Sequence, residues 1–340
     1  MTDRSLHAPV TADGLHAVTR TLDTVDDLLD ALGPDGFIWS EGGAGLATSG
    51  VAARVPAARV AEVLATVVVD DEVQRPGTGA VAVGALPFDR DAEAVLTVPA
   101  RVVGRDGDGR CWVTHIGPRL EPAPAPLPRA TRFTVRSVEQ RGWWEHAVEV
   151  ALDDIAHGRF EKVVLAREVL VEADTPFEPR AVLRRLRSQQ PGCILYADAG
   201  FVGATPELLV RRTADSFECR PMAGTAPGSV AAEVAARLSA SGKDAREHRF
   251  VVEAMRDALG PVVATIAVPD TPVVEHFGSL AHLVTPILGT LAADDPAELA
   301  ERGASAGAAV PSALDLARRL HPTPAVGGTP TDAALDAIRR

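Results

Sequence analysis

Lys162 is the first residue whose setting suggests chemistry. It opens the run Lys-Val-Val-Leu-Ala-Arg, in which β-strand alternation would place Lys162, Val164 and Ala166 on one face. A lysine that shares a face with buried apolar side chains is driven toward its neutral form, and a neutral amine can act as a general base. The same pattern also fits a lysine at a strand end whose ammonium group reaches water, and pattern alone favours this simpler interpretation.

Glu207 is a candidate for the complementary acid. It lies in Gly203-Ala-Thr-Pro-Glu-Leu-Leu209, where a proline precedes it and apolar residues follow. A carboxyl group in apolar surroundings has a raised pKa and can stay protonated near neutral pH, ready to donate a proton. A glutamate at a strand edge, paired with Arg211 or Arg212, explains the pattern equally well.

Asp244 and Glu247 are three residues apart and would share one face of a helix. Apolar residues continue that stripe, so it is the expected inward face. Acidic groups on an inward face need a cation, and oxygen ligands suit Mg²⁺. For Asp244 alone, a place in the first turn after a capping Ser241 is the simpler interpretation, and Glu247 could instead pair with Lys243 or Arg246.

Two further segments could contact a small anionic or hydroxylated molecule. Gly224 and Thr225, in Ala223-Gly-Thr-Ala-Pro-Gly228, offer backbone N–H groups and a hydroxyl, although such turns usually serve only the backbone. His282 could donate a hydrogen bond to a substrate hydroxyl, but a core histidine bonded to a carbonyl is the commoner outcome. Neither a Walker loop nor a dinucleotide-binding glycine motif is present, and the histidines do not have zinc-site spacing.

These residues depend on elements that the hydrophobic pattern indicates. Helical spacing runs from Trp144 to Ile155 with Gly158 as a C-cap, and a strand is predicted from Lys162 to Val171. Further on, the pattern predicts helices over Pro179–Arg187 and Lys243–Leu259, and strands over Cys193–Tyr196, Phe201–Gly203 and Leu208–Arg211. In the first 120 residues, strands over Val95–Val103 and Cys111–Val113 flank a turn at 106–109, which predicts a hairpin and antiparallel sheet.

The chain divides into a half without motifs, residues 1–120, a proline-rich connector, residues 121–131, and a motif-bearing half, residues 132–340. We expect the halves to form a single α+β domain. With 340 residues, 46% hydrophobic and 24% charged, the chain has the composition of a globular protein.

Charge and cysteine content narrow the class of partner. A net charge of −12 argues against nucleic acid and anionic membrane surfaces. Three widely spaced cysteines predict neither a disulfide framework nor a cysteine zinc site. The sequence shows no secretory signal and no membrane span, so we expect a cytoplasmic protein.

In order along the chain, the motifs resemble those of the chorismate-utilising enzymes, most closely the isochorismate synthases of menaquinone and siderophore synthesis. The similarity covers roughly residues 140–340. The matching strings are Glu161-Lys-Val-Val-Leu-Ala-Arg167, Gly203-Ala-Thr-Pro-Glu-Leu-Leu209, Ala223-Gly-Thr-Ala-Pro-Gly228, Ser241-Gly-Lys-Asp-Ala-Arg-Glu-His248, Ala281-His-Leu-Val-Thr285 and Leu320-His-Pro-Thr-Pro-Ala-Val-Gly-Gly328.

This resemblance implies a fold and a reaction. The fold would be α+β, with stacked, mainly antiparallel sheets enclosed by helices. The reaction would be the reversible, Mg²⁺-dependent isomerisation of chorismate to isochorismate. Lys162 would activate the water that attacks C2, and Glu207 would protonate the C4 hydroxyl as it leaves.

The resemblance also implies the binding residues. Glu247 would bind Mg²⁺, and Asp244 would support the metal site from outside its direct ligands. Gly224 and Thr225 would line the substrate site, with His282 close by.

Smaller features separate the branches of the family. Thr331 follows Gly328-Thr-Pro330, where the anthranilate, aminodeoxychorismate and salicylate synthases carry a lysine. The first half also lacks the Leu-Leu-Glu-Ser pattern of anthranilate synthases. We therefore expect an isomerase that acts as a monomer without a glutaminase subunit, with those other synthases as the alternative.

The family pattern also extends past the helix corresponding to Thr331–Ile338, into a segment with further metal-binding glutamates and an Arg-Gly-x-Tyr-x-Gly motif. This chain stops at Arg340. A truncated, non-catalytic or partner-dependent member of the family is therefore a further alternative.

Overall fold

The fold is described from a computed structural model covering residues 14–117, 130–227, 237–238, 240–278, 280–291 and 310–340. Contacts divide the chain into two compact units. The first comprises Met1–Arg129 and Phe177–Pro206, and the second comprises Ala130–Pro176 and Glu207–Arg340. The segment 177–206 thus packs with the first half of the chain, although it follows the connector in sequence. Most of the connector, residues 121–129, lies outside the described residues, and the single domain stays a prediction.

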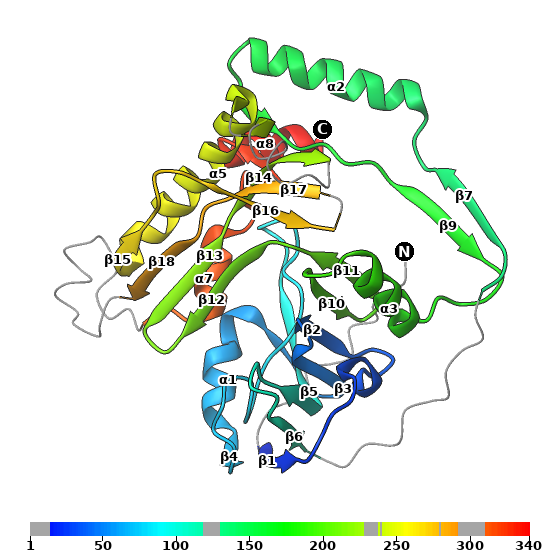
Figure 1. The fold of residues 1–340 in the computed structure, drawn as a ribbon, viewed down its shortest axis with the longest axis vertical. Coiled ribbons are helices and arrows are strands. Elements are labelled where there is room, and N and C mark those ends of the chain that lie inside the picture. The colour runs from blue at the N-terminus through cyan, green and yellow to red at the C-terminus, as the bar shows by residue number, and fades with distance from the viewer. Residues whose placement is uncertain (1–13, 118–129, 228–236, 239, 279, 292–309) are drawn as a thin grey trace. The chain divides into compact units, whose positions relative to one another are not determined.

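The first unit is built on an eight-stranded sheet, whose strands are labelled in Figure 1. Its strand order is β11-β10-β2-β3-β5-β6-β1-β4, and every pair is antiparallel except β1 with β4. The strands are β1 (His16–Leu22), β2 (Phe37–Glu41), β3 (Ala44–Pro56), β4 (Val68–Asp71), β5 (Val95–Arg105), β6 (Cys111–Ile116), β10 (Ile194–Asp198) and β11 (Phe201–Thr205). The predicted hairpin is confirmed, because β5 pairs with β6.

Short helices bury apolar side chains against this sheet. They are η1 (Leu28–Ala31), η2 (Ala57–Arg59), α1 (Val60–Thr66) and α3 (Pro179–Gln189). Leu183 of α3, Leu29 of η1 and Ile38 of β2 belong to one buried cluster. That shared core is why the segment 177–206 belongs to the first unit.

The described residues of the second unit form four smaller sheets, all antiparallel. A four-stranded sheet has the order β12-β13-β18-β15 and a three-stranded sheet the order β14-β17-β16, while β19 pairs with β8 and β7 with β9. The strands of the two larger sheets are β12 (Leu208–Thr213), β13 (Ser216–Arg220), β14 (Met222–Pro227), β15 (Val263–Ala267), β16 (Val273–Phe277), β17 (Leu280–Val284) and β18 (Ile287–Leu291). The mixture of helices with mainly antiparallel sheets confirms the predicted α+β class.

Helix α5 (Gly242–Leu259) covers the second unit's sheets and matches its predicted span. The Ser241 hydroxyl caps it by accepting a hydrogen bond from the amide of Asp244 at 3.2 Å. Val251, Met255 and Leu259 are fully buried at helical spacing and form a core with residues of β13 and β18. Figure 1 shows α5, in yellow, with the short helices α7 (Ala313–Leu320) and α8 (Thr331–Arg339) in the same unit. The short helix η3 (Gly260–Val262) directly follows α5.

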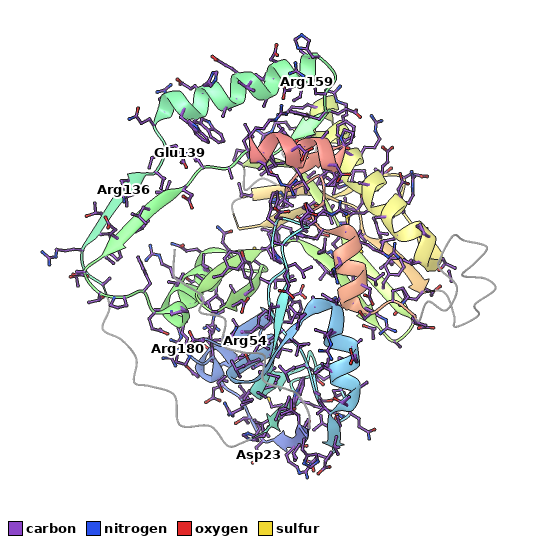
Figure 2. The ribbon with its side chains drawn as sticks, turned by 180° about the vertical axis from the view of Figure 1, so that it is seen from behind. Asp23, Arg54, Arg136, Glu139, Arg159 and Arg180 are labelled. Atoms are coloured by element: carbon purple, nitrogen blue, oxygen red, sulfur yellow. The ribbon has the colours of Figure 1, made fainter. Side chains whose placement is uncertain are left out.

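Helix α2 (Arg141–Ala156) forms where helical spacing predicts it, and Gly158 follows it with a φ of +70°. Its predicted apolar face is largely uncovered: Leu152 is 60% exposed, and the one buried residue of the helix is Asp154. In Figure 2, Arg136 and Glu139 lie before the start of α2 and Arg159 lies beyond its end. No helix among the described residues is long and apolar enough to cross a membrane.

The prediction of one continuous strand from Lys162 to Val171 is wrong. The structure has β8 (Lys162–Val163), then residues without regular structure, then β9 (Val169–Ala173). The break occurs because the two pieces pair with different partners: β8 with β19 (Gly328–Thr329), and β9 with β7 (Phe133–Ser137). Sequence periodicity cannot show where a strand changes its neighbour.

Candidate active site

Lys162 lies at the centre of a group of polar residues in the second unit. Its ammonium nitrogen Nζ donates to the carbonyl oxygen of Pro324 at 2.7 Å and lies 3.1 Å from Oε1 of Glu247. The side chain is only 13% exposed. Lys162 is therefore held by a buried carbonyl and a carboxylate, whereas the simpler interpretation of its sequence pattern has the ammonium group in water.

Gly328 allows the segment 320–328 to pack closely against the backbone of Lys162. It pairs with Val163, next to Lys162, in the short β8–β19 sheet. A Cβ at Gly328 would overlap the carbonyl oxygen of Lys162 and come within 2.5 Å of Cβ of Ala334. Only glycine allows this close approach, and the same segment supplies the Pro324 carbonyl that receives the ammonium group.

Glu207 occupies the apolar setting that its sequence predicts. Burial raises the pKa of its carboxyl to about 7, while the backbone amide of Met222 and the charge of Lys162 oppose that rise without cancelling it. Arg211, one of the suggested partners, lies 3.1 Å from Glu218. A substantial fraction of Glu207 is therefore protonated near neutral pH, close enough to Lys162 to sense its charge.

The first turns of α5 bring two carboxylates beside this pair. Glu247 contacts Lys162, not Lys243 or Arg246 as the sequence alternative has it. Asp244 lies one turn earlier against β14, where a Cβ on Gly224 would come within 3.0 Å of the Asp244 Cβ. Gly224, at a φ of +74°, thus permits helix α5 to approach the strand closely.

Thr225 and His282 face each other across β14 and β17. Oγ1 of Thr225 lies 3.1 Å from Nδ1 of His282, and burial lowers the pKa of this histidine below its ordinary value. A neutral imidazole and a hydroxyl are therefore placed together one residue along the strand from Gly224. The sequence predicts these residues as a site, but their direct contact depends on strand register.

His248 is a polar residue of this region that the sequence analysis does not single out. It is 4% exposed, and its Nε2 lies 2.7 Å from Oγ1 of Thr285. Burial lowers its pKa to about 4. The sequence feature that could have identified His248 is its position directly after Glu247, on the face of the helix that is expected to point inward.

A magnesium ion is the cofactor that the resemblance implies, and the described residues can be compared with its needs. No three histidine, cysteine, aspartate or glutamate side chains gather as a ligand set among them. Mg²⁺ sites in proteins often use only one or two carboxylates, and water and substrate oxygens complete the shell. Glu247, with Asp244 one turn away on the same helix, fits a site of this kind.

Lys162 is unusual because the chain contains only one other lysine. Lysine and arginine together number 34, but only Lys162 and Lys243 are lysines. A guanidinium does not lose its proton in proteins, whereas an amine can. The site therefore has one of only two basic side chains that could exchange a proton as an amine, next to a carboxyl group with a pKa of about 7. This pair can divide general base and general acid work between them.

Comparisons with known proteins identify the family of the chain. Residues 119–340 match the family described as chorismate binding enzyme. MenF of Mycobacterium tuberculosis (strain H37Rv) is 37% identical over 279 residues, which are 78% of this chain and 68% of the relative. The isochorismate synthase DhbC of Bacillus subtilis is 32% identical over 271 residues, which are 75% of this chain and 62% of the relative. The chain thus spans about two thirds of the length of these relatives.

A solved structure extends the likeness to the fold. DhbC from Bacillus anthracis superposes with a TM-score of 0.71 at 29% sequence identity, covering 92% of this chain and 79% of that chain. The predicted family and fold are therefore confirmed.

Proposed function

Because the chain belongs to the chorismate-binding enzymes, we propose that it isomerises chorismate to isochorismate by adding water at C2 and releasing the C4 hydroxyl. The observation that carries the proposal is a buried Glu207, whose pKa of about 7 suits a proton donor at neutral pH, close enough to Lys162 to sense its charge. The relative named as an isochorismate synthase supports this choice of reaction.

Each residue has a defined task in this reaction. Lys162, in its neutral form, takes a proton from water as the water oxygen bonds to C2. The Glu247 carboxylate, 3.1 Å from Nζ, stabilises the ammonium group that results. The ring double bonds shift, the C4–O bond breaks, and Glu207 donates its proton to the departing oxygen. One water enters and one leaves, so the product is an isomer of the substrate.

We further propose that Mg²⁺ is the cofactor and that Glu247 holds it, with Asp244 supporting the site. When bound, the ion would neutralise the ring carboxylate of chorismate. In a chain of net charge −12, a dianionic substrate requires such a local positive charge. Gly224 and Thr225 line the substrate site, and the imidazole of His282 offers a hydrogen bond to a substrate hydroxyl. We propose that the chain acts as a monomer without a glutaminase subunit.

The test compares three lysine variants of the chain. Chorismate consumption and isochorismate formation are followed by chromatography in the presence of Mg²⁺, and again after chelation. Lys162→Ala and Lys162→Arg should each lose about 10²–10⁴-fold in kcat, because arginine can keep the contact with Glu247 but cannot release a proton. Lys243→Arg, at the other lysine, should keep the wild-type rate.

Several outcomes would contradict the proposal. Full activity of Lys162→Arg would show that the amine is not the base. Formation of pyruvate with salicylate, or of anthranilate with ammonia, would assign the chain to another branch of the family. A folded wild-type chain that leaves chorismate unchanged would favour the non-catalytic or partner-dependent alternative. An undiminished rate after chelation would remove Mg²⁺ from the proposal.

A further inference from the structure

His248 and Thr285 form a buried hydrogen-bonded pair that has no task in the reaction described above. The imidazole comes from the second turn of α5, directly after Glu247, and the hydroxyl comes from the residue that follows β17. Both residues are at most 4% exposed, and the Nε2–Oγ1 distance is 2.7 Å. The bond therefore joins the helix that carries Glu247 to the strand that carries His282.

The surroundings of the imidazole determine which nitrogen bears the proton. Nδ1 of His248 is buried and has no hydrogen-bond partner among the described residues. A buried N–H without a partner is rarer in proteins than a buried acceptor without one. The setting therefore favours the tautomer with the proton on Nε2, in which Nε2–H donates to Oγ1 of Thr285 and only the acceptor Nδ1 stays unpaired.

The backbone of Thr285 extends this hydrogen-bonded connection toward Glu207, the proposed acid. Its amide donates to the carbonyl of Pro221 at 3.3 Å. The next residue, Met222, directs its own amide at the Glu207 carboxyl. A short series of hydrogen bonds thus links the helix beside Glu247 to the strand that binds Glu207.

We propose that His248 is a positioning residue, whose Nε2–H bond to Thr285 holds Glu247 and Glu207 in register on either side of Lys162. The catalytic part of this inference rests on the proposed function. A shift of α5 by a fraction of a turn would separate Glu247 from Lys162, which is held independently by the Pro324 carbonyl. Small displacements of this kind act on the rate of the chemical step more than on substrate binding.

The decisive variants change only the hydroxyl. Thr285→Val keeps the shape but removes the acceptor, and should lower kcat by up to about 10²-fold while KM changes little. Thr285→Ser restores the acceptor and should recover most of the rate. Thr114→Val is the matched control, because it removes the buried 2.8 Å bond between the Thr19 and Thr114 hydroxyls of the first unit. It should lower Tm without lowering kcat.

Two measurements do not depend on turnover and so separate this inference from the proposed function. Nitrogen-15 correlation spectra of the imidazoles should show His248 as the Nε2–H form. Amine labelling followed by mass spectrometry should show Lys162 reacting faster in Thr285→Val than in the wild type, with Lys243 as internal reference. If the wild type does not convert chorismate, these two results still decide whether the bond positions Glu247.

Contrary results are equally definite. An Nδ1–H form of His248, or a Thr285→Val chain with wild-type kcat and an unchanged Lys162 to Lys243 labelling ratio, would overturn the inference. If Thr285→Val does not fold, His248→Gln and His248→Leu replace it, because only the glutamine can still donate to Thr285. Equal kcat and equal labelling in those two variants would also overturn it.

Discussion

Glu207 shows how one residue acquires its chemistry from its surroundings. Its carboxyl is buried, and the positive charge of Lys162 is too weak to cancel the effect of burial, so its pKa lies at about 7. An acid must be protonated to donate. The protonated fraction of Glu207 therefore falls as the pH rises through about 7. Because the reaction needs Glu207 with its proton and Lys162 without one, the pH profile of kcat depends on both groups, whereas Glu207→Gln should be inactive at every pH. Measuring kcat against pH for both chains tests this, and a Glu207→Gln chain with the wild-type rate would exclude Glu207 as the acid.

The raised pKa of the same carboxyl group also leads to a prediction about the free energy of unfolding. Between its ordinary pKa of 4.5 and about 7, Glu207 keeps a proton in the folded chain that it loses in the unfolded chain. Stability should therefore fall as the pH rises through this window. Glu207→Gln should unfold like the wild type near pH 4 and be more stable at pH 8, by on the order of 2 kcal/mol. Urea unfolding at the two pH values tests this, and a difference that does not depend on pH would contradict it.

At the scale of elements, the shortest strands have the most direct effect on the site. The pair β8–β19 contains two residues on each side, yet it fixes the backbone of Lys162. Gly328→Ala should break this pair, because its Cβ would overlap the Lys162 carbonyl. We expect loss of activity and a lower Tm, measured by the chorismate assay and by thermal unfolding.

The neighbouring glycine supplies the control for this prediction. A Cβ at Gly327 would meet its nearest atom, the carbonyl oxygen of Thr323, at 3.6 Å, which is an ordinary contact. Gly327→Ala should therefore keep most of the activity and stability. Equal behaviour of the two alanine variants would show that the approach of Gly328 to Lys162 does not matter.

At the scale of the whole molecule, net charge governs the encounter with substrate. A chain of net charge −12 repels a dianion at long range, and salt screens that repulsion. Raising the ionic strength from about 10 mM to 150 mM, at constant free Mg²⁺, should raise kcat/KM for chorismate, by roughly twofold. A fall in kcat/KM would show instead that positive groups near the site attract the substrate.

The local features of the protein can be predicted from its residues alone. Helix α5 and its Ser241 cap follow from residues a few positions apart, whereas the local run around Glu207 left a raised pKa and an ion pair equally open, and burial in the fold raised it. The motif order also indicated the family that the comparisons show. Each of these inferences depends on short-range periodicity or on residue type, and both can be read directly from the amino-acid sequence.

Contacts between residues far apart in sequence became known from the three-dimensional fold. Lys162 contacts Pro324, which is 162 positions away, and Glu247 contacts Lys162 in place of Lys243 or Arg246, which are nearer to it in sequence. The change of strand partner after Val163 and the burial of His248 against Thr285 likewise depend on register between separated segments. Pairing over such distances is set by how sheets and helices share a core, so no local pattern records it.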